Sequence, residues 1–370
     1  MSFVFPCLIG ISLLRIASRC DSARYWRWCY WIAGSLLLVA QLYAGYYFGW
    51  FLILSLGIAI AWSVILPSTR TEFRLLLRRD LVPIAAAVAI AAVGLRPFFV
   101  HYTRAARDLG VRPFAEVQLT LPQPQSWLHV GTNHWVWGWT ASREVFKDLP
   151  LEYEHRIGFG YITPLICALG FSLQRGRKSV CLTALVLCTL VVFATSFPSL
   201  SFWRILYEWI PGGSAIRAVT RVGLITLLLA SIGFASFVQS EWATRRPWLT
   251  SLLCLICIVE QGVTTPSYDK GYVRRRVLQL ASRIDPNCDS FYYHPRPERL
   301  SFNDAQLDAL WASLHRRVPT INGYSGGFPP GWSGLLVVNA PGGPTPHDAL
   351  GEWARFRKLP WNRICQIIDD

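Results

Sequence analysis

Apolar stretches about as long as a bilayer is thick alternate with short arginine-rich segments as far as Val263. An α-helix needs roughly 20 apolar residues to cross the hydrocarbon core of a membrane. The pattern therefore predicts eight membrane-spanning helices. They are expected at about 3–17, 28–44, 48–66, 81–100, 158–174, 180–196, 219–238 and 248–263.

Four clusters of basic residues set the orientation of these spans, because the cytoplasmic loops of membrane proteins carry an excess of arginine and lysine. Placing every cluster inside requires the first span to enter from the outer side. Two long outer loops then follow, at about 101–157 and 197–218, and the segment from 265 onwards also lies outside. The clusters consist of Arg15, Arg19, Arg24 and Arg27; Arg70, Arg74, Arg78 and Arg79; Arg175, Arg177 and Lys178; and Arg245 and Arg246.

After residue 264 the sequence becomes mixed and polar, which predicts a second domain at 265–370 behind a transmembrane helical domain at 1–264. Short apolar runs at 290–293, 334–338 and 364–368 are typical of strands and alternate with two helical patterns. We expect a small α/β domain on the outer, extracytoplasmic face. The fold class is thus an all-α polytopic membrane protein with a small C-terminal α/β domain.

Capping residues position the two helices of this domain. Asn303 is the predicted N-cap of the first helix, with Gln306 at its third position. The second helix begins at Thr345, a capping residue followed by proline and then by a carboxylate in the first turn. The apolar side chains expected on one face of the first helix are Leu307, Leu310, Trp311 and Leu314.

The composition agrees with a membrane location. Of the 370 residues, 52% are hydrophobic and only 16% are charged, too few charges for the surface of a soluble protein of this size. The formal charge of +14 is concentrated in clusters that face the anionic inner leaflet, and no zinc or RNA-binding pattern accompanies it, so nucleic-acid binding is not expected. The scarcity of lysine beside abundant arginine is typical of GC-rich bacterial genomes. The expected location is therefore a bacterial cytoplasmic (inner) membrane.

Cysteine and histidine positions say little about chemistry. Eight of the ten cysteines lie in or beside predicted spans, where cysteine is usually a small buried apolar residue. Cys288 and Cys365 are the only two in the outer domain, and we predict a disulfide between them because that compartment is oxidising. All seven histidines fall on the predicted outer side, but none has the spacing of a helical metal-binding motif, so no metal site is predicted from them.

The first outer loop contains candidate groups for phosphate and metal binding. Arg104, together with arginines at 107 and 112, could receive a phosphate, because the guanidinium fork matches phosphate oxygens. Glu152 and Glu154 could hold a divalent cation beside a lipid-phosphate leaving group. A Glu-x-Glu pattern is very common, and a solvated loop is the alternative interpretation.

The second outer loop ends in two arginines. Arg217 and Arg221 are four residues apart at the start of a span, so they are expected to share one helical face. They would lie at headgroup depth near a helix N-terminus, a position that favours anions. Two interpretations stay open: the pair clamps the phosphate of a lipid donor, or it extends to the phosphates of ordinary lipids.

The outer domain contains a glycine- and proline-rich segment, VPTINGYSGGFPPGW at 318–332. Its glycines supply positive-φ positions, and its proline pair stiffens the exit. Asn322, Tyr324 and Ser325 are its candidate binding residues. The segment could line a cleft for a sugar or a lipid phosphate, or it could be a rigid turn that packs against the rest of the protein.

Four segments of the chain resemble a known family. They are QLYAGYYFGWFL at 41–52, HYTRAARDLG at 101–110, LYEWIPGGSAIRAVTRVG at 206–223 and INGYSGGFPPGW at 321–332. With them the chain resembles bacterial polytopic glycosyltransferases of the GT-C-like kind, which use polyprenyl-phosphate sugars. The resemblance implies transfer of a sugar on the outer membrane face, with a lipid phosphate as the leaving group.

The resemblance covers the C-terminal part of such enzymes. Their catalytic acid lies in the first large outer loop, after the first span, whereas this chain starts among what correspond to later spans. The resemblance therefore implies that the N-terminal catalytic region is missing, and no catalytic residue is carried over. It matches Arg217 and Arg221 to the family's arginine-rich span entry, and Asn322, Tyr324 and Ser325 to its outer-domain loop.

Two functional hypotheses follow. The first is a GT-C-like membrane glycosyltransferase, or the C-terminal part of one, in which an outer-loop acid acts as base or as ligand of a divalent cation. The second is a non-catalytic subunit or pseudo-enzyme that binds lipid-linked glycan for a partner subunit, which supplies the missing region. A transporter or flippase is disfavoured, because the sequence has no strongly broken helix pair and no repeated half. The acids that the first hypothesis considers are Asp108, Glu116, Glu152 and Glu154.

Overall fold

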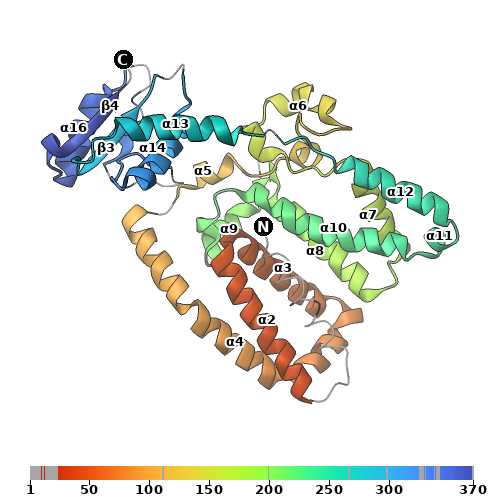
Figure 1. The fold of residues 1–370 in the computed structure, drawn as a ribbon. Coiled ribbons are helices and arrows are strands. Elements are labelled where there is room, and N and C mark those ends of the chain that lie inside the picture. The colour runs from red at the N-terminus through yellow and green to blue at the C-terminus, as the bar shows by residue number, and fades with distance from the viewer. Residues whose placement is uncertain are drawn as a thin grey trace. The chain divides into compact units, whose positions relative to one another are not determined.

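The computed structural model divides into two compact units, Met1–Thr265 and Pro266–Asp370. Helices are the predominant secondary structure in the described part of both units (Figure 1). The span expected at 3–17 falls almost wholly outside the described residues, and so does Ser325. The structure describes residues 10, 12, 24–110, 112–198, 200–265, 267–296, 299–324, 329, 331–336, 338 and 342–368.

Three helices in the described part of the first unit are long and apolar enough to cross a membrane. They coincide with the spans expected at 48–66, 81–100 and 219–238 and occupy Tyr46–Ile65, Pro67–Arg107 and Val219–Val238. The longer helices of this unit are α2 (Arg24–Ala44), α3 (Tyr46–Ile65), α4 (Pro67–Leu109), α7 (Ile162–Leu173), α8 (Lys178–Ala194), α10 (Gly223–Val238) and α12 (Pro247–Glu260).

Short elements connect these helices. They are α5 (Phe114–Gln118), η1 (Pro124–Leu128), η2 (Gly138–Ser142), α6 (Glu144–Lys147), η3 (Glu152–His155), β1 (Ser196–Phe197), β2 (Leu200–Ser201), α9 (Trp203–Trp209), η4 (Gly213–Ala215), η5 (Val219–Val222) and α11 (Glu241–Thr244). The two short strands pair antiparallel with each other. The core of the unit packs α3 and α8 against the segment that leads into α10, around Phe51, Leu190, Trp203 and Ile216.

Helix α4 changes direction at a buried aspartate. With 43 residues it would measure about 65 Å if straight, twice the thickness of a hydrocarbon core. Asp80 has non-helical dihedral angles (φ −115°, ψ 15°) and separates an arginine-rich part from an apolar part. Its carboxylate accepts hydrogen bonds from Arg27 Nη1 of α2 at 3.0 Å, from Trp31 Nε1 at 3.3 Å and from Arg79. These partners compensate a carboxylate that is removed from solvent.

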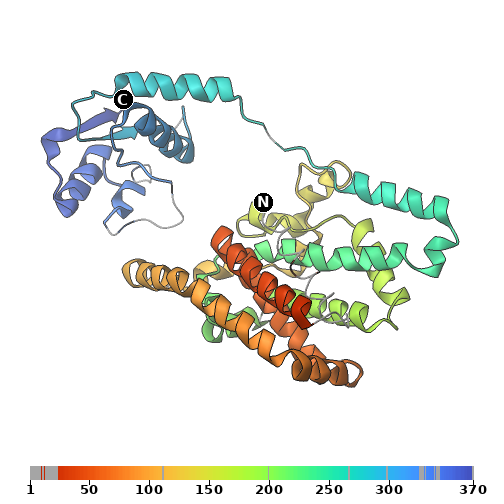
Figure 2. The same ribbon diagram turned by 60° about the horizontal axis from the view of Figure 1, so that its bottom comes forward.

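Helices of the first unit contact one another through small and hydroxyl side chains. Helix α2 lies beside α4 in both ribbon views (Figure 1 and Figure 2), and Ser35 Oγ of α2 donates to the carbonyl oxygen of Ala87 at 2.6 Å. Helix α7 crosses α10 where Gly170 and Gly233 meet, because a Cβ at either position would collide with backbone of the other helix. Such close approaches are typical of helices that pack within a membrane.

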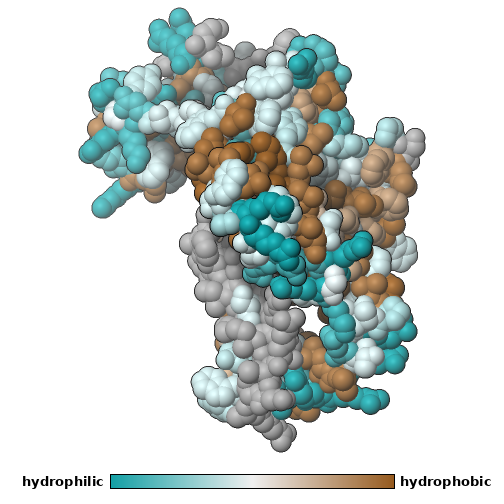
Figure 3. All heavy atoms as spheres, turned by 90° about the vertical axis from the view of Figure 1, so that its right-hand side faces the viewer, coloured by the Kyte–Doolittle hydropathy of each residue, from teal (hydrophilic) through white to brown (hydrophobic). Residues whose placement is uncertain are grey.

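The outer faces of the shorter helices are also apolar. Leu165 and Leu169 of α7 and Ile258 of α12 are exposed. Figure 3 shows hydrophobic residues gathered over the side of the molecule that faces the viewer, interrupted by hydrophilic groups. Exposed apolar areas of this kind indicate surfaces that contact lipid or protein rather than water.

The second unit combines helices with a two-stranded parallel sheet. Strands β3 (Ser290–His294) and β4 (Ile364–Ile368) pair in register from Ser290–Ile364 to His294–Ile368, and both strands agree with the sequence prediction. The other elements are α13 (Lys270–Arg283), α14 (Phe302–Arg316), α15 (Ser333–Leu336), α16 (Pro346–Arg357) and η6 (Trp361–Arg363).

The strand predicted at 334–338 is wrong, because the chain forms the short helix α15 there. Leu335 of this helix is buried in a cluster with Trp332 and Leu350. A short apolar run satisfies the pattern of a strand and of a buried helical turn equally well, so the pattern alone could not separate them.

The predicted start of α14 is also wrong. Ser301, not Asn303, is the N-cap, and its hydroxyl accepts a hydrogen bond from the backbone N–H of Asp304 at 3.2 Å. Thr345 caps α16 as predicted, with its hydroxyl accepting from the N–H of Asp348 at 3.1 Å. The large apolar side chains of α14 form one face, but this face is exposed, whereas Ala305, Ala309 and Ala312 are buried.

A disulfide joins Cys288 and Cys365, whose Cα atoms are 5.9 Å apart. Cys288 lies just before β3 and Cys365 is the second residue of β4. The bond therefore links the residues just before β3 to strand β4, across a sequence separation of 77 residues.

Candidate functional site

The two arginines at the entry of α10 do not share a helical face. Arg217 lies in an extended segment between Ile216 (ψ 102°) and Ala218 (ψ 83°). Arg221 lies in the 3₁₀ turn η5. The expected α-helical spacing is wrong here because the neighbouring Ile216, Ala218 and Val219 are fully buried and fix the backbone in the core.

Tyr47, in the first turn of α3, brings these arginines together. Its hydroxyl accepts hydrogen bonds from the backbone N–H of Arg217 at 3.0 Å and of Ala218 at 3.4 Å. The guanidinium carbon of Arg221 lies 4.8 Å from the centre of the Tyr47 ring, which is a favourable cation–π distance. Thr120 donates its hydroxyl hydrogen to the carbonyl oxygen of Arg217. The main chain of Arg217 is thus held on both sides.

Glu116 of α5 adds a carboxylate to this cluster. Its Oε1 atom accepts a hydrogen bond from Arg112 Nη1 at 2.5 Å and lies 3.9 Å from Arg217 Nη1. About a third of each of these three side chains is exposed. We call Arg112, Glu116, Arg217, Arg221 and Tyr47 the arginine cluster. It contains three guanidinium groups and one carboxylate, and all four charged side chains are at least partly exposed.

The end of α4 lies close to the start of α3, where the arginine cluster begins. The ring of Tyr102 is 5.2 Å from that of Tyr46, and the hydroxyl of Tyr46 donates to the carbonyl oxygen of Gly212 at 2.8 Å. Arg104 is exposed on this end of α4, and among the described residues no ion pair joins it to the cluster. Asp108 belongs to the same helix, and its side chain lies outside the described part.

Glu152 is engaged by a histidine and an arginine. It accepts hydrogen bonds from Arg156 Nε at 2.9 Å and Nη2 at 2.7 Å, and its Oε1 atom contacts His129 Nε2. The hydrogen bond from Arg156 lowers the pKa of Glu152, and the contact with His129 acts in the same direction. A carboxylate paired in this way is a weak base and a poor free metal ligand. In the described ranges, no group of three or more histidine, cysteine, aspartate and glutamate side chains is placed to hold a metal ion, and Glu154 belongs to no such group.

A buried serine–histidine pair lies beside Glu152, and no sequence motif indicates it. Ser126 Oγ is 2.8 Å from His155 Nδ1, and His155 Nε2 is 3.1 Å from the carbonyl oxygen of Leu119. Ser126 also accepts from the backbone N–H of Gln123 at 2.9 Å. Both side chains of the pair are fully buried, so no substrate reaches them. The pair fixes the fold of the outer loop.

Glu260, at the end of α12, also has a structural role. Its carboxylate accepts the backbone N–H groups of Ile162 at 2.8 Å and Thr163 at 2.6 Å, at the start of α7. It also accepts Trp137 Nε1 at 2.6 Å. Only 1% of Glu260 is exposed. A carboxylate at a helix N-terminus is stabilised by the free N–H groups and by the helix dipole. Gly160 (φ 96°) lets the chain pass this carboxylate, since a Cβ there would collide with it.

Asn322 of the glycine-rich segment is likewise buried. Its side chain accepts from the N–H of Tyr293 at 2.8 Å and donates to the carbonyl oxygen of Tyr293 at 2.9 Å, so it pairs with β3 as a strand would. Its amide also donates to Gln306 Oε1 at 3.1 Å. Tyr324 is exposed. A pocket of about 500 Å³ adjoins Asn322, with Trp332 among its lining residues.

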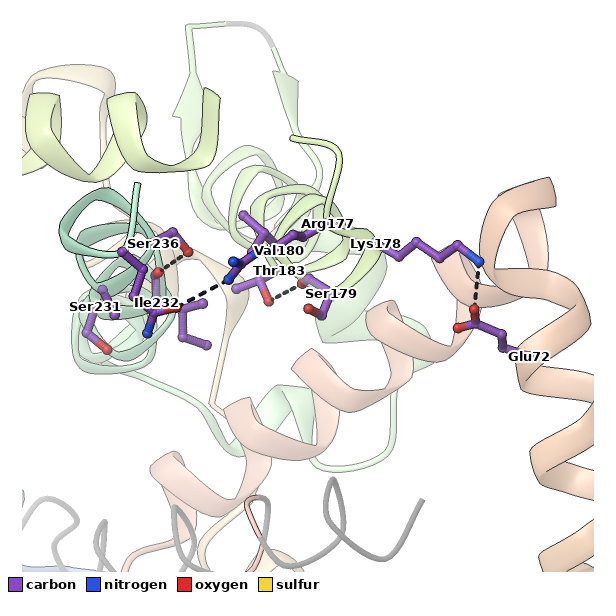
Figure 4. Close-up of a pocket in the computed structure, with 11 residues that line it drawn as sticks. Glu72, Arg177, Lys178, Ser179, Val180, Thr183, Ser231, Ile232 and Ser236 are labelled. Carbon is purple, nitrogen blue, oxygen red and sulfur yellow. Dashed lines mark hydrogen bonds and ion pairs between the residues drawn. The ribbon is translucent and has the colours of Figure 1, made fainter. Parts of the chain in front are cut away.

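In the first unit, a pocket of about 670 Å³ lies between the start of α8 and the end of α10, with Glu72 of α4 also among its lining residues (Figure 4). Lys178 Nζ of α8 is 2.6 Å from Glu72 Oε1 of α4, and Arg177 Nη1 donates to Gln239 Oε1 at 3.2 Å. Two of the arginine-rich segments of the sequence therefore meet here through Glu72, and the basic groups of Arg177 and Lys178 are engaged in these contacts.

Comparison with known protein families, with characterised proteins and with solved structures finds no match to this chain. The geometry of the arginine cluster and the four segments quoted above are therefore the grounds for a functional assignment.

Proposed function

We propose that this protein is a GT-C-like integral membrane protein that binds the phosphate of a polyprenyl-phosphate-linked sugar at the arginine cluster. The observation that carries the proposal is the meeting of Arg217 and Arg221 at Tyr47, with Arg112 beside them. The guanidinium groups of Arg112 and Arg217 lie beside the carboxylate of Glu116, and that of Arg221 lies over the ring of Tyr47. The phosphate of the donor is a diester with one negative charge, whereas the released polyprenyl phosphate is a monoester with about −1.5 to −2 charges at neutral pH.

The arrangement of helix ends supports a membrane location with this cluster on the outer side. Segments that are expected on the outer side of the membrane contact one another, because Tyr46 at the start of α3 donates a hydrogen bond to Gly212 of the second outer loop. Helix ends that are expected on the inner side also contact one another, because Lys178 at the start of α8 forms an ion pair with Glu72 of α4. Apolar helices of membrane-spanning length connect the two sets. We propose the eight-span topology in a bacterial inner membrane on this basis, with the second unit as an extracytoplasmic α/β domain.

The cluster suits phosphate better than it suits a carboxylate or a neutral sugar. Guanidinium groups bind phosphate oxygens through paired, charge-assisted hydrogen bonds. The ring of Tyr47 restricts the side chain of Arg221, which lowers the side-chain entropy lost on binding, and hydrogen bonds hold the main chain of Arg217 in place. The position at the entry of an apolar helix would let the prenyl chain of the ligand remain in the bilayer.

Sugar transfer at this site requires a base, and Glu116 is the acid that lies in the cluster. It would take the proton of an acceptor hydroxyl while that oxygen bonds to the sugar's anomeric carbon. The bond from that carbon to the phosphate oxygen would break, and the arginines would hold the departing lipid phosphate. The ion pair with Arg112 at 2.5 Å favours the alternative, a subunit that binds lipid-linked glycan without turning it over, because Oε1 of Glu116 already accepts a hydrogen bond from Arg112.

A binding experiment tests the proposal. The protein in lipid nanodiscs is titrated with polyprenyl phosphate, wild type beside Arg217→Ala/Arg221→Ala. Each lost charge-assisted contact is worth about 1.5–3 kcal/mol, so we expect at least a tenfold weaker affinity. Arg245→Ala/Arg246→Ala is the matched control, because Arg246 also lies over an aromatic ring, that of Trp242 at 5.1 Å. Equal affinity of both double variants would disprove the site.

A measurement of turnover distinguishes an active glycosyltransferase from a non-catalytic subunit. With a polyprenyl-phosphate sugar and an acceptor, release of polyprenyl phosphate is measured for wild type, Glu116→Gln and Glu154→Gln. An enzyme that uses Glu116 loses release in the first variant and keeps it in the second, with binding intact in both. Binding without release in the wild type supports the non-catalytic subunit.

A further inference from the structure

Helices α13 and α14 of the second unit present large apolar side chains to solvent. Trp311 and Leu314 of α14 are 60% and 72% exposed. We call this surface the α13–α14 face. Its exposed apolar residues are Tyr268, Tyr272, Leu278, Leu307, Trp311 and Leu314. The two helices border a groove of about 630 Å³.

The exposure of these residues is built into α14. The apolar residues on its buried side are small, namely Ala305, Ala309 and Ala312, which let the helix approach the core of the unit. The large apolar residues occupy the opposite side. A water-soluble helix has the reverse distribution, because exposing tryptophan and leucine forgoes their burial, about 1.5–3 kcal/mol for each large side chain. The face is therefore made for contact with something other than water.

The charge of the face is mainly basic, although Asp304 also lines the groove. Helix α13 carries five basic residues and no acidic residue. Arg276 forms an ion pair with the buried Asp308 of α14, which holds the two helices together. Lys270 and Arg274 line the groove and are exposed. Arg275 is exposed next to them. The apolar residues are thus bordered by cationic side chains.

We propose that the α13–α14 face docks into the headgroup region of an anionic bilayer. Aromatic and leucine side chains enter the boundary between headgroups and acyl chains, while Lys270 and Arg274 contact lipid phosphates. Helix α13 begins ten residues after the apolar helix α12 ends at Glu260, so it is tethered to a segment of membrane-type composition. This combination favours a lipid surface over a protein partner. The inference rests on the proposed membrane location.

Photochemical labelling of the whole protein tests the docking. The protein is placed in nanodiscs that contain phosphatidylglycerol with a diazirine near the headgroup end of one acyl chain. After irradiation, lipid adducts are mapped on peptides by mass spectrometry. We expect adducts on residues 270–283 and 302–316. Trp311→Ser/Leu314→Ser should reduce labelling there at least fivefold. The control Phe356→Ser/Leu359→Ser, on the exposed side of α16 and the residues after it, should leave it unchanged.

A second experiment tests the role of charge in the docking. Lys270→Glu/Arg274→Glu, or replacement of phosphatidylglycerol by a zwitterionic lipid, should lower labelling of the face severalfold. Thermal unfolding of each variant shows that the fold is kept. Labelling that does not respond to charge, or that covers α16 as strongly as α14, would overturn the proposal in favour of a protein partner or of random contact.

Labelling of α3 and α10 in the same sample separates this inference from the proposed membrane location. Adducts on α3 and α10 without adducts on α13 and α14 would refute the docking alone. If none of the four helices is labelled, the membrane location fails, and the docking fails with it.

Discussion

The guanidinium of Arg221 lies over the ring of Tyr47 at 4.8 Å, while the hydroxyl of the same tyrosine accepts the backbone N–H of Arg217 at 3.0 Å. The side chain of Tyr47, at the start of α3, therefore contacts both arginines that precede α10, about 170 residues away in sequence. The ring contacts the guanidinium group of Arg221, and the hydroxyl contacts the main chain of Arg217. The two effects can be separated by substitution.

Tyr47→Phe keeps the ring and removes the hydroxyl. The N–H groups of Arg217 and Ala218 then lose their acceptor, which should lower the free energy of unfolding by about 1–3 kcal/mol. Tyr47→Leu also removes the cation–π contact, worth about 0.5–2 kcal/mol, and should weaken polyprenyl-phosphate binding further than Tyr47→Phe does. Thermal unfolding and ligand titration in nanodiscs measure both effects. Tyr153→Phe, at an exposed tyrosine of the same unit, is the control. Equal affinities of the Phe and Leu variants would contradict a role for the ring.

The buried His155 predicts a dependence of stability on pH. Burial lowers the pKa of His155 below its ordinary value, because the charged ring would lose its hydration. When the pH falls below about 6.5, the unfolded chain takes up a proton that the folded chain resists. The free energy of unfolding should therefore fall between pH 7 and pH 5, by at most about 1.4 kcal/mol per pH unit for one such group. Above pH 7 this contribution is fully present and constant.

His155→Gln tests that dependence. Thermal unfolding temperatures of the detergent-solubilised protein are recorded from pH 8 to pH 5. The variant should start from a lower value, because the contacts with Ser126 and Leu119 are altered, and should decline less steeply as the pH falls. Part of the decline should remain, because burial also lowers the pKa of His134. His101→Gln, at an exposed position on α4, should match the wild-type slope. A variant slope as steep as that of the wild type would refute the assignment to His155.

The contact of Glu260 with the start of α7 predicts a large loss of stability in Glu260→Gln. The carboxylate accepts hydrogen bonds from Ile162, Thr163 and Trp137. A glutamine amide has one acceptor oxygen and would turn N–H groups toward some of these donors. We expect the free energy of unfolding to fall by about 2–4 kcal/mol, seen as a lower unfolding temperature. Glu241→Gln, at an exposed ion pair with Arg245, should change it by less than about 1 kcal/mol. Similar melting of both variants would mean that Glu260 is dispensable.

Local features of this fold follow more readily from the sequence than long-range contacts do, although the disulfide between Cys288 and Cys365 was predicted across 77 residues. Thr345 was identifiable as a helix cap because the signal lies within four residues. The start of α14 was misplaced because Ser301 and Asn303 are both good caps, and only the backbone geometry at Asp304 decides between them. The helical period of Leu307 and Trp311 was correct, yet periodicity cannot show which face of a helix the domain buries.

The same distinction applies to the candidate site. Arg217 and Arg221 were recognisable as basic residues at the entry of a span. Their common partner Tyr47 and the nearby Glu116 lie in distant segments of the chain. A pattern within one segment cannot predict contacts between distant segments. The expected helical face failed because buried neighbours extend the backbone before α10 starts. Glu152 and Glu260 were identifiable as acids, but their engagement by Arg156 and by α7 depends on the folded structure.

The disulfide between Cys288 and Cys365 should account for much of the stability of the second unit. It closes a chain segment with a sequence separation of 77 residues, and the loop-entropy model gives about 4 kcal/mol for a loop of this length. Cys288→Ser, or treatment with reductant, should therefore lower the unfolding temperature of this unit and expose its segments to limited proteolysis. Cys188→Ser, which changes an exposed free cysteine in the first unit, should leave both properties unchanged. If reductant alters neither unfolding nor proteolysis while alkylation shows that both thiols were released, the bond is not a stabilising element, and the hydrogen-bonded pairing of β3 with β4 suffices to hold the sheet.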